Sequence, residues 1–270
     1  MSERPSDGRY KDLWVRTLSG AALALVALGA FWYGPPVSTL LIAIGVALMV
    51  MECQNMVLAP MNPDRFALAV AVGLGAGLIF LQDIMGFRFF LPALAVSVAM
   101  IITLEARRRA WVAASFAYVV AAMASLVALR ATSAHGFELV LWLILVVAAA
   151  DIGAYFSGRR FGGPKLWPAV SPKKTWSGTA GGWVSALGAG AIFAAAAGIS
   201  MPKALALSLV AAVASQAGDL MESALKRHFG VKDAGNFLPG HGGVLDRLDG
   251  LMAAAILCAA IGLRYEYFLA

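Results

Sequence analysis

Apolar runs of about 20 residues recur along nearly the whole of this 270-residue chain. A helix of that length crosses the roughly 30 Å hydrocarbon core of a bilayer, where backbone polar groups must pair within the protein. The chain is 61% hydrophobic and 13% charged, whereas about a quarter of a typical soluble domain is charged. The sequence therefore predicts an all-α, polytopic membrane protein.

About nine transmembrane helices are expected, with boundaries good to a few residues. They cover residues 13–33, 36–58, 66–82, 88–104, 110–130, 136–157, 178–198, 203–225 and 249–268. The first is read as a membrane helix, because its run lacks a clear leader cleavage site and many spans follow it. The runs 66–82 and 88–104 are weak, and either one could be re-entrant. We divide the chain into an N-terminal transmembrane region, 1–135, with about five helices, and a C-terminal region, 136–270.

Lys and Arg are distributed unevenly between these spans. With the N-terminus in the cytoplasm, 17 of the 21 fall on the cytoplasmic side, and only Arg88, Arg130, Lys203 and Arg264 fall on the other. Positive charge accumulates in cytoplasmic loops, so a cytoplasmic N-terminus and an odd number of spans are favoured. The net charge of +6 then reflects topology and anionic lipid, and no nucleic-acid partner is expected.

Polar residues that could carry chemistry gather near the end of the eighth span. Asp219 lies within an apolar helix, where an unpaired carboxylate is costly. Glu222, Ser223 and Lys226 follow on the same helical face. An internal pair between Glu222 and Lys226 would explain Glu222, but it would not explain Asp219, one turn deeper.

A second polar group lies in the stretch HGGVLDRLDG, residues 241–250. His241 begins a Gly-Gly turn that lets the backbone approach a ligand, and Asp246 and Asp249 follow at the start of the last span. The helix dipole alone would account for one of these carboxylates. Together with Asp219 they form a candidate site for a hard cation such as Mg²⁺, which completes its shell with water and phosphate oxygens.

The segment between the sixth and seventh spans is basic. Its SPKKT stretch, residues 171–175, sets Lys173, Lys174 and two hydroxyls just before a helix, an arrangement suited to phosphate. It is not a Walker A loop, because GxxxxGKS and GxxxxGKT are absent. Alone it would more often be an ordinary positive-inside loop, but a second charged loop on the same face favours a ligand site. Asp151, in the preceding span, is a further candidate for a metal site or for orienting a lysine.

Phosphate-binding cations beside clustered carboxylates suit phosphoryl or nucleotidyl transfer, in which catalysis is mostly positioning and charge neutralisation. The sequence holds no G-x-S-x-G motif that would indicate a serine hydrolase instead. A site at the membrane–cytoplasm boundary would let a lipid meet a soluble nucleotide.

Residues 223–249, SALKRHFGVKDAGNFLPGHGGVLDRLD, resemble the signature of the phosphatidate cytidylyltransferase (CDP-diacylglycerol synthase) family. DIGAYFSGRRFG and SPKKTWSG upstream resemble family segments too, so the resemblance covers roughly 148–250, and residues 1–140 match only in being apolar. It implies that CTP and phosphatidic acid form CDP-diacylglycerol and pyrophosphate with Mg²⁺, and it allows a second, monovalent cation. It also implies an inner (cytoplasmic) membrane enzyme, a homodimer, whose active site in the C-terminal region faces the cytoplasm.

With the resemblance in view, we assign the roles ourselves. The expected metal ligands are first Asp219 and Asp246, then Asp249, with Asp151 as a further member. The expected substrate-binding residues are Ser171, Lys173, Lys174, Thr175, Ser223, Lys232 and Arg247. The expected catalytic residues are Lys226, Arg227, Asp246 and His241, of which Lys226 and Arg227 would neutralise phosphates and His241 would contact nucleotide, position an Asp or only shape the turn. Glu52, a lone acid in the second span, should face the helix bundle.

Three alternatives remain open at this level. A CTP-dependent kinase of a membrane lipid alcohol would need similar sites but would release CDP. A cation-coupled transporter would spread its acids over several broken helices at mid-membrane, whereas here they gather at one edge. A purely structural membrane subunit is the third alternative.

Overall fold

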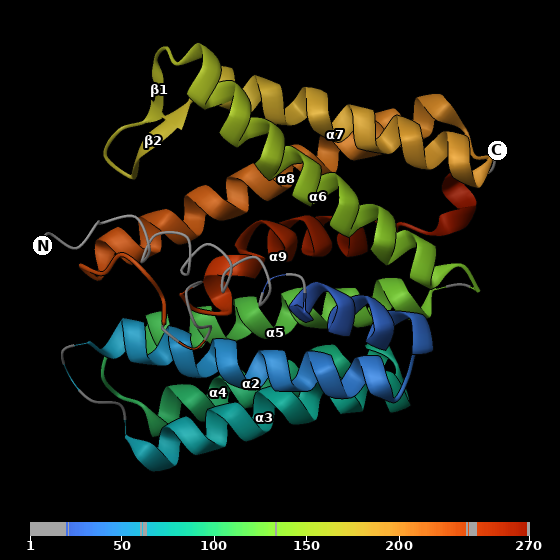
Figure 1. The fold of residues 1–270 in the computed structure, drawn as a ribbon. Helices are drawn as coiled ribbons and strands as arrows, with labels where there is room; N and C mark the ends of the chain where they lie inside the picture. The colour runs from blue at the N-terminus through green and yellow to red at the C-terminus, as the bar shows by residue number, and fades with distance from the viewer. Residues whose placement is uncertain are drawn as a thin grey trace, which may run out of the picture.

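Helices make up most of the chain in a computed structural model, which describes residues 20, 22–59, 61, 64–132, 134–235, 237 and 242–268 (Figure 1). A helical segment, Ala22–Tyr33, comes first. The helices that follow are α2 (Val37–Leu58), α3 (Arg65–Met85), α4 (Phe87–Leu104), α5 (Arg109–Ala131), α6 (Gly136–Phe161), α7 (Trp176–Ala197), α8 (Met201–His228) and α9 (Leu245–Ala260). A short 3₁₀ helix, η1 (Tyr265–Phe268), ends the described chain.

Six of these helices, α2, α3 and α5 to α8, are long and apolar enough to cross a bilayer. A helical, polytopic membrane fold is therefore present. The helical segment Ala22–Tyr33 and α4 are apolar but shorter. The last predicted span, 249–268, differs from the structure, because α9 starts earlier, at Leu245, and already ends at Ala260. The count of nine spans and the cytoplasmic N-terminus stay predictions.

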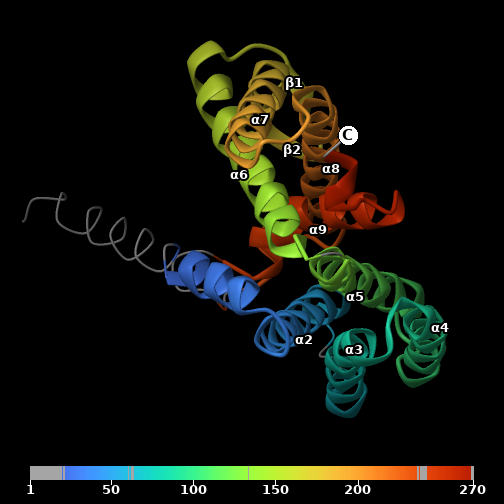
Figure 2. The same ribbon diagram turned by 90° about the vertical axis from the view of Figure 1, so that its right-hand side faces the viewer.

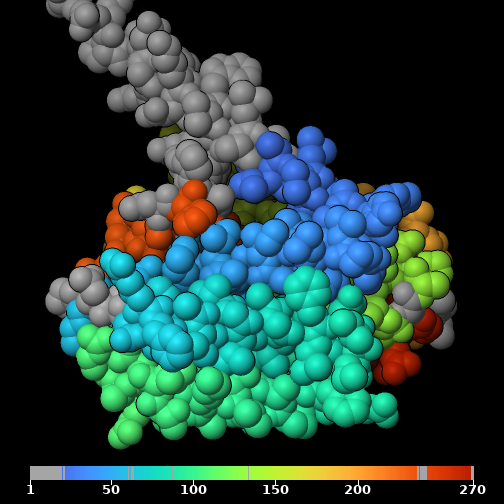
Figure 3. Space-filling view, turned by 90° about the horizontal axis from the view of Figure 1, so that it is seen from below, coloured from blue at the N-terminus to red at the C-terminus, as the bar shows by residue number. Residues whose placement is uncertain are grey.

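The helices form two groups with α9 between them, as the view in Figure 2 shows. Helices α2 to α5 lie on one side of α9, and α6 to α8 lie on the other. Side chains buried on α2, α5 and α9, such as Val46, Phe116 and Met252, belong to one hydrophobic core. Figure 3 looks onto the outer face of the first group, where α3 lies beside α2. Phe66, on α3, stays exposed, as suits a helix that faces lipid.

The segment between α6 and α7 departs from the all-α expectation. Strand β1 (Lys165–Trp167) pairs antiparallel with β2 (Ser171–Thr175), so SPKKT is a strand and not a loop. Lys165 lies opposite Thr175 and Trp167 lies opposite Ser171. A two-stranded hairpin leaves outer backbone groups unpaired, which water can satisfy outside a bilayer but lipid cannot. The hairpin therefore belongs to the aqueous side, and it holds its lysines on a paired ribbon.

Glycines allow α6, α7, α8 and α9 to approach one another closely. A Cβ on Gly182 of α7 would lie 2.8 Å from the Ala150 carbonyl oxygen of α6. A Cβ on Gly218 of α8 would lie 2.7 Å from the carbonyl oxygen of Asp249 on α9. Both contacts lie next to candidate metal ligands. Asp151 follows Ala150, Asp219 follows Gly218, and Asp249 itself supplies the second carbonyl oxygen. Small residues at these crossings thus bring the three acids toward one place.

The charged segments gather at one end of the molecule. The hairpin and the end of α8 lie at the left-hand end in Figure 1, and α9 begins in the same half of the molecule. The turn between α4 and α5, which carries Arg107 and Arg108 and leads into Arg109 at the start of α5, lies on the same side. This grouping agrees with the uneven distribution of Lys and Arg along the sequence.

Candidate active site

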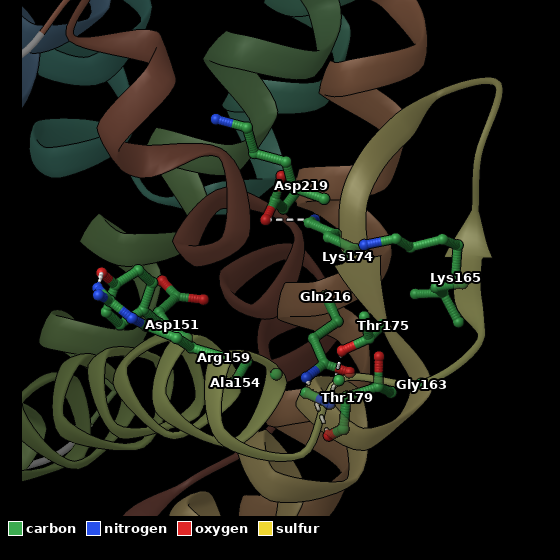
Figure 4. Close-up of a pocket in the computed structure, with 16 residues that line it drawn as sticks. Asp151, Ala154, Arg159, Gly163, Lys165, Lys174, Thr175, Thr179, Gln216 and Asp219 are labelled. Carbon is green, nitrogen blue, oxygen red and sulfur yellow. Dashed lines mark hydrogen bonds and ion pairs between the residues drawn. The ribbon is translucent and has the colours of Figure 1, made fainter.

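A polar cavity of about 480 Å³ opens between the hairpin and the adjoining ends of α6, α7 and α8 (Figure 4). Its lining includes Asp151, Tyr155 and Arg159 from α6, Lys165 from β1, Lys173, Lys174 and Thr175 from β2, Thr179 from α7, and Gln216 and Asp219 from α8. Among the described residues it thus collects four cationic side chains and two carboxylates. Such a lining can accept a polyanion and, beside it, a cation.

Lys174 and Asp219 form an ion pair across this cavity, drawn as a dashed line in Figure 4. Their side chains are 27% and 32% exposed, so the pair is partly shielded from water. The hydroxyl of Ser223, one turn along α8, lies 3.4 Å from Asp219 Oδ1. The structure therefore joins the predicted phosphate-binding strand to the predicted metal-binding helix.

Thr175 has a structural task as well as a place in the cavity. Its hydroxyl oxygen accepts a hydrogen bond from the Gly178 backbone N–H at 3.1 Å, which caps the N-terminus of α7. The residue is 5% exposed. Lys173 and Lys174 precede this cap, so the start of α7 fixes where their strand ends. Ser171 is not among the residues that line the cavity.

Lys226 is the centre of a second polar cluster. Its Nζ donates to Asp246 Oδ1 at 2.7 Å and lies 3.1 Å from Glu222 Oε1. The expected pair between Glu222 and Lys226 is thus present, and Asp246 joins it. Asp246 also accepts the backbone N–H groups of Gly243 at 2.9 Å and Ala234 at 3.0 Å. Burial opposes ionisation of Asp246, but these donors outweigh it, so the pKa of this carboxyl lies below its ordinary value.

Three carboxylates from three helices lie near enough for their charges to interact. Asp249 of α9 interacts with Asp219 of α8, and Asp151 of α6 interacts with both. Within the described part of the chain, no three His, Cys, Asp or Glu side chains are arranged to hold a metal ion by themselves. An ion bound here would therefore draw further ligands from water or substrate, as Mg²⁺ commonly does.

Other predicted residues are placed outside this cavity. Arg227 donates from Nη1 to the Val231 carbonyl oxygen at 3.0 Å, and Lys232 and Arg247 are exposed. None of the three lines the polar cavity. His241 lies outside the described residues. The substrate and catalytic roles assigned to these four residues stay predictions.

Sequence reasoning did not assign Arg159, Tyr155, Lys165 or Gln216 to the site. Arg159 donates from Nη1 to the Tyr155 hydroxyl at 2.9 Å, and both side chains line the cavity. The basic run GRRFGGPK contains two of the four residues, so its charge was a usable signal. Gln216 carries no such signal, because a neutral amide in an apolar helix is typical of an ordinary contact between helices.

A second cavity, of about 490 Å³, lies between α5 and α8 and is mainly apolar. Its lining includes Trp111, Ala114 and Tyr118 from α5 and Met221 and Leu225 from α8. Helix α8 therefore presents one face to the polar cavity and another to the apolar cavity.

Comparison with known proteins identifies the family of this chain. The model of the Cytidylyltransferase family matches residues 14–264, and the chain belongs to that family. The phosphatidate cytidylyltransferase of Brucella suis biovar 1 (strain 1330) is 38% identical over 259 residues, which is 93% of each chain. The enzyme of the same name from Bacillus subtilis (strain 168) is 46% identical over 126 residues, 46% of this chain and 47% of the relative. That of Haemophilus influenzae is 47% identical over 126 residues, 44% of each chain. The family inferred from residues 223–249 is thus confirmed.

Proposed function

We propose that this protein is a phosphatidate cytidylyltransferase, which transfers CMP from CTP to phosphatidic acid and releases pyrophosphate. The observation that carries the proposal is the polar cavity, in which four cations and two carboxylates meet at the end of membrane-spanning helices. Relatives that bear this name match almost the whole chain, which supports the same reaction.

The chemistry needs a held triphosphate and neutralised charge. A phosphate oxygen of phosphatidic acid attacks the α-phosphorus of CTP, the new P–O bond forms, and the bond to the bridging oxygen of pyrophosphate breaks. Lys173 and Lys174 on β2, with Arg159 and Lys165 nearby, supply the fixed positive charge that stabilises the triphosphate and the leaving pyrophosphate. Lys226, about two turns along α8 from Asp219, is held by Asp246 and Glu222.

The carboxylates suit Mg²⁺, which we place with Asp219 and Asp249 and with Asp151 alongside. Both oxygens of Asp246 already accept hydrogen bonds, so its first role would be to hold Lys226 and the loop before α9. When bound, Mg²⁺ would withdraw charge from the phosphates of CTP. The three acids repel one another, and an ion among them would relieve that repulsion. A second, monovalent cation stays a prediction from the resemblance.

The two cavities on either side of α8 suit the two substrates. CTP is polar and would occupy the polar cavity from the cytoplasm. The acyl chains of phosphatidic acid need an apolar environment, which the cavity between α5 and α8 supplies. The phosphate would then lie near the end of α8, between the two. We further propose an inner-membrane location, a cytoplasmic active site and a homodimer, as the family resemblance implies.

The decisive experiment follows two labels. Purified protein in detergent is incubated with phosphatidic acid, Mg²⁺ and CTP labelled at either the α- or the γ-phosphate, and the lipids are separated. Label from the α-position should enter the lipid, with pyrophosphate released. Transfer of the γ-label to a lipid alcohol, with CDP as co-product, would instead identify a lipid kinase. If neither label is transferred, both enzyme functions are excluded, and a transporter or a structural subunit remains as the alternative.

A metal test accompanies this assay. EDTA should stop the transfer, and added Mg²⁺ should restore it. Asp219→Asn should abolish turnover in protein that is still folded and inserted, because the carboxylate charge is lost while the side-chain size is kept. Wild-type rates in this variant would exclude Asp219 as a metal ligand.

A further inference from the structure

Glu52, near the end of α2, is an acidic side chain that is only 3% exposed. Its oxygens accept backbone hydrogen bonds from Val244 at 3.0 Å and from Leu245 at 2.9 Å. Among the described residues, none of the salt bridges includes Glu52. A buried carboxylate without a cationic partner is costly, so its two backbone bonds must matter to the fold around it.

These two bonds cap α9 from another helix. Val244 occupies the N-cap position of α9, and no side chain there caps the helix. The first N–H groups of any helix lack partners within the helix, and they attract negative charge. In α3 the cap is local, because the adjacent Asp64 accepts hydrogen bonds from the N–H groups of Phe66 and Ala67. For α9 the acceptor comes from α2, 192 positions earlier in the chain.

Two glycines leave room for this carboxylate. A Cβ on Gly243 would lie 2.8 Å from Glu52 Oε2, and the three atoms nearest to it all belong to Glu52. A Cβ on Gly235 would lie 2.6 Å from Glu52 Oε1. The loop before α9 is therefore shaped around the Glu52 side chain.

The loop before α9 leads directly to the candidate active site. The Gly243 N–H donates to Asp246, which binds Lys226, and Asp249 follows within α9. The end of α2 is itself anchored, because Arg108 Nη1 donates to the Val57 carbonyl oxygen at 2.6 Å and to that of Ala59 at 3.2 Å. A displacement of the Glu52 carboxylate would thus be transmitted to the start of α9.

We propose that Glu52 is a positioning residue of the active site. It fixes the start of α9, and with it Asp246 and Asp249, relative to Asp219 on α8, without touching substrate. The catalytic part of this inference rests on the proposed cytidylyltransferase function.

The first test replaces the carboxylate by an amide of the same size. Glu52→Gln keeps one acceptor oxygen but turns an NH₂ group toward a backbone N–H, so the start of α9 should loosen. We expect kcat to fall about 10- to 100-fold, as misplacement of catalytic groups by about an ångström does, with KM for CTP changed less than about threefold. Amide hydrogen exchange should rise at residues 242–250 and stay unchanged in the other helices.

Asp83→Asn is the matched control. Asp83 accepts from the Thr39 hydroxyl at 2.9 Å, so it also binds α2 through a carboxylate, but at the start of that helix and not at the end that carries Glu52. This variant should keep kcat within about twofold of wild type, because its bond does not involve the start of α9. A kcat of Glu52→Gln within the same range would overturn the proposal. A loss of protection throughout the protein would also overturn it, because Glu52 would then be a general fold determinant.

A double-mutant cycle tests the same contact independently of Glu52→Gln. Gly243→Ala should lower kcat at least about tenfold, because its methyl group meets Glu52. Glu52→Asp withdraws the carboxylate by one methylene, so Gly243→Ala should cost less than about threefold further in that background. An equal cost in both backgrounds would sink the inference. If the wild-type protein forms no CDP-diacylglycerol, the proposed function fails, while hydrogen exchange at residues 242–250 still decides whether Glu52 holds α9.

Discussion

Lys174→Gln tests whether the hairpin holds substrate phosphate or serves only as a charged segment. The change removes the positive charge while side-chain length and polarity are largely kept. In the structure the Lys174 ammonium pairs with Asp219 and lines the polar cavity. The two roles predict effects of different size, because an ion pair between side chains and a bond to a bound phosphate differ in strength.

The burial of the pair sets these magnitudes. Both side chains are roughly one-third exposed, so water screens the Lys174–Asp219 pair. The pair itself should therefore contribute at most about 1 kcal/mol of stability. A charge-assisted bond to phosphate in a partly dehydrated cavity is worth about 1.5–3 kcal/mol. Because 1.4 kcal/mol corresponds to a factor of ten, loss of that bond should lower kcat/KM roughly 10- to 100-fold. Lys173→Gln should act in the same direction if its ammonium also binds phosphate.

The assay measures kcat/KM separately for CTP and for phosphatidic acid in each variant, after insertion has been checked. Lys174→Arg keeps the charge and should recover much of the loss, whereas Lys203→Gln, exposed at the other end of α8, should be neutral. A fall for CTP alone would assign the strand to the nucleotide, and a fall for phosphatidic acid alone would assign it to the lipid head group. If Lys173→Gln and Lys174→Gln both stay within about twofold of wild type, the phosphate-binding role is refuted.

Three further predictions concern packing, the lipid and topology. Gly218→Ala should cost about 1–3 kcal/mol and lower the Tm, because its Cβ would lie 2.5 Å from the Ala253 Cβ, whereas Gly188→Ala, with nothing within 4 Å, should not destabilise. Ala114→Trp should fill the apolar cavity and raise KM for phosphatidic acid but not for CTP; equal changes in both would exclude acyl chains from that cavity. Lys203→Cys should react with an impermeant thiol reagent from outside the cell and Lys232→Cys should not; the reverse labelling would invert the proposed orientation.

Local properties of the chain explain what could be inferred without coordinates. Apolar length decides that a segment lies in a bilayer, so the membrane class and most spans could be read directly. The spacing within residues 223–249 identified the family, because charged and Gly positions in an otherwise apolar chain are specific. The pairing of Lys226 with Glu222 was also accessible, since the two residues are one helical turn apart. The strand at residues 171–175 was missed, because a short hairpin depends on its partner strand more than on its own composition.

Contacts between distant segments were decided only by the tertiary structure. From the sequence, Glu52 is a lone acid that should face the bundle, and it does so, but nothing near it in the chain indicates α9 as its partner. That partner depends on how α2, α5 and α9 pack, and on the glycines that admit the carboxylate. Likewise, hydropathy places Gln216 and Asp219 in a helix, but the crossings of α6, α7 and α9 with α8 turn them toward one cavity. Periodicity and hydropathy are local quantities, whereas an active site is built from side chains that meet only when the helices pack.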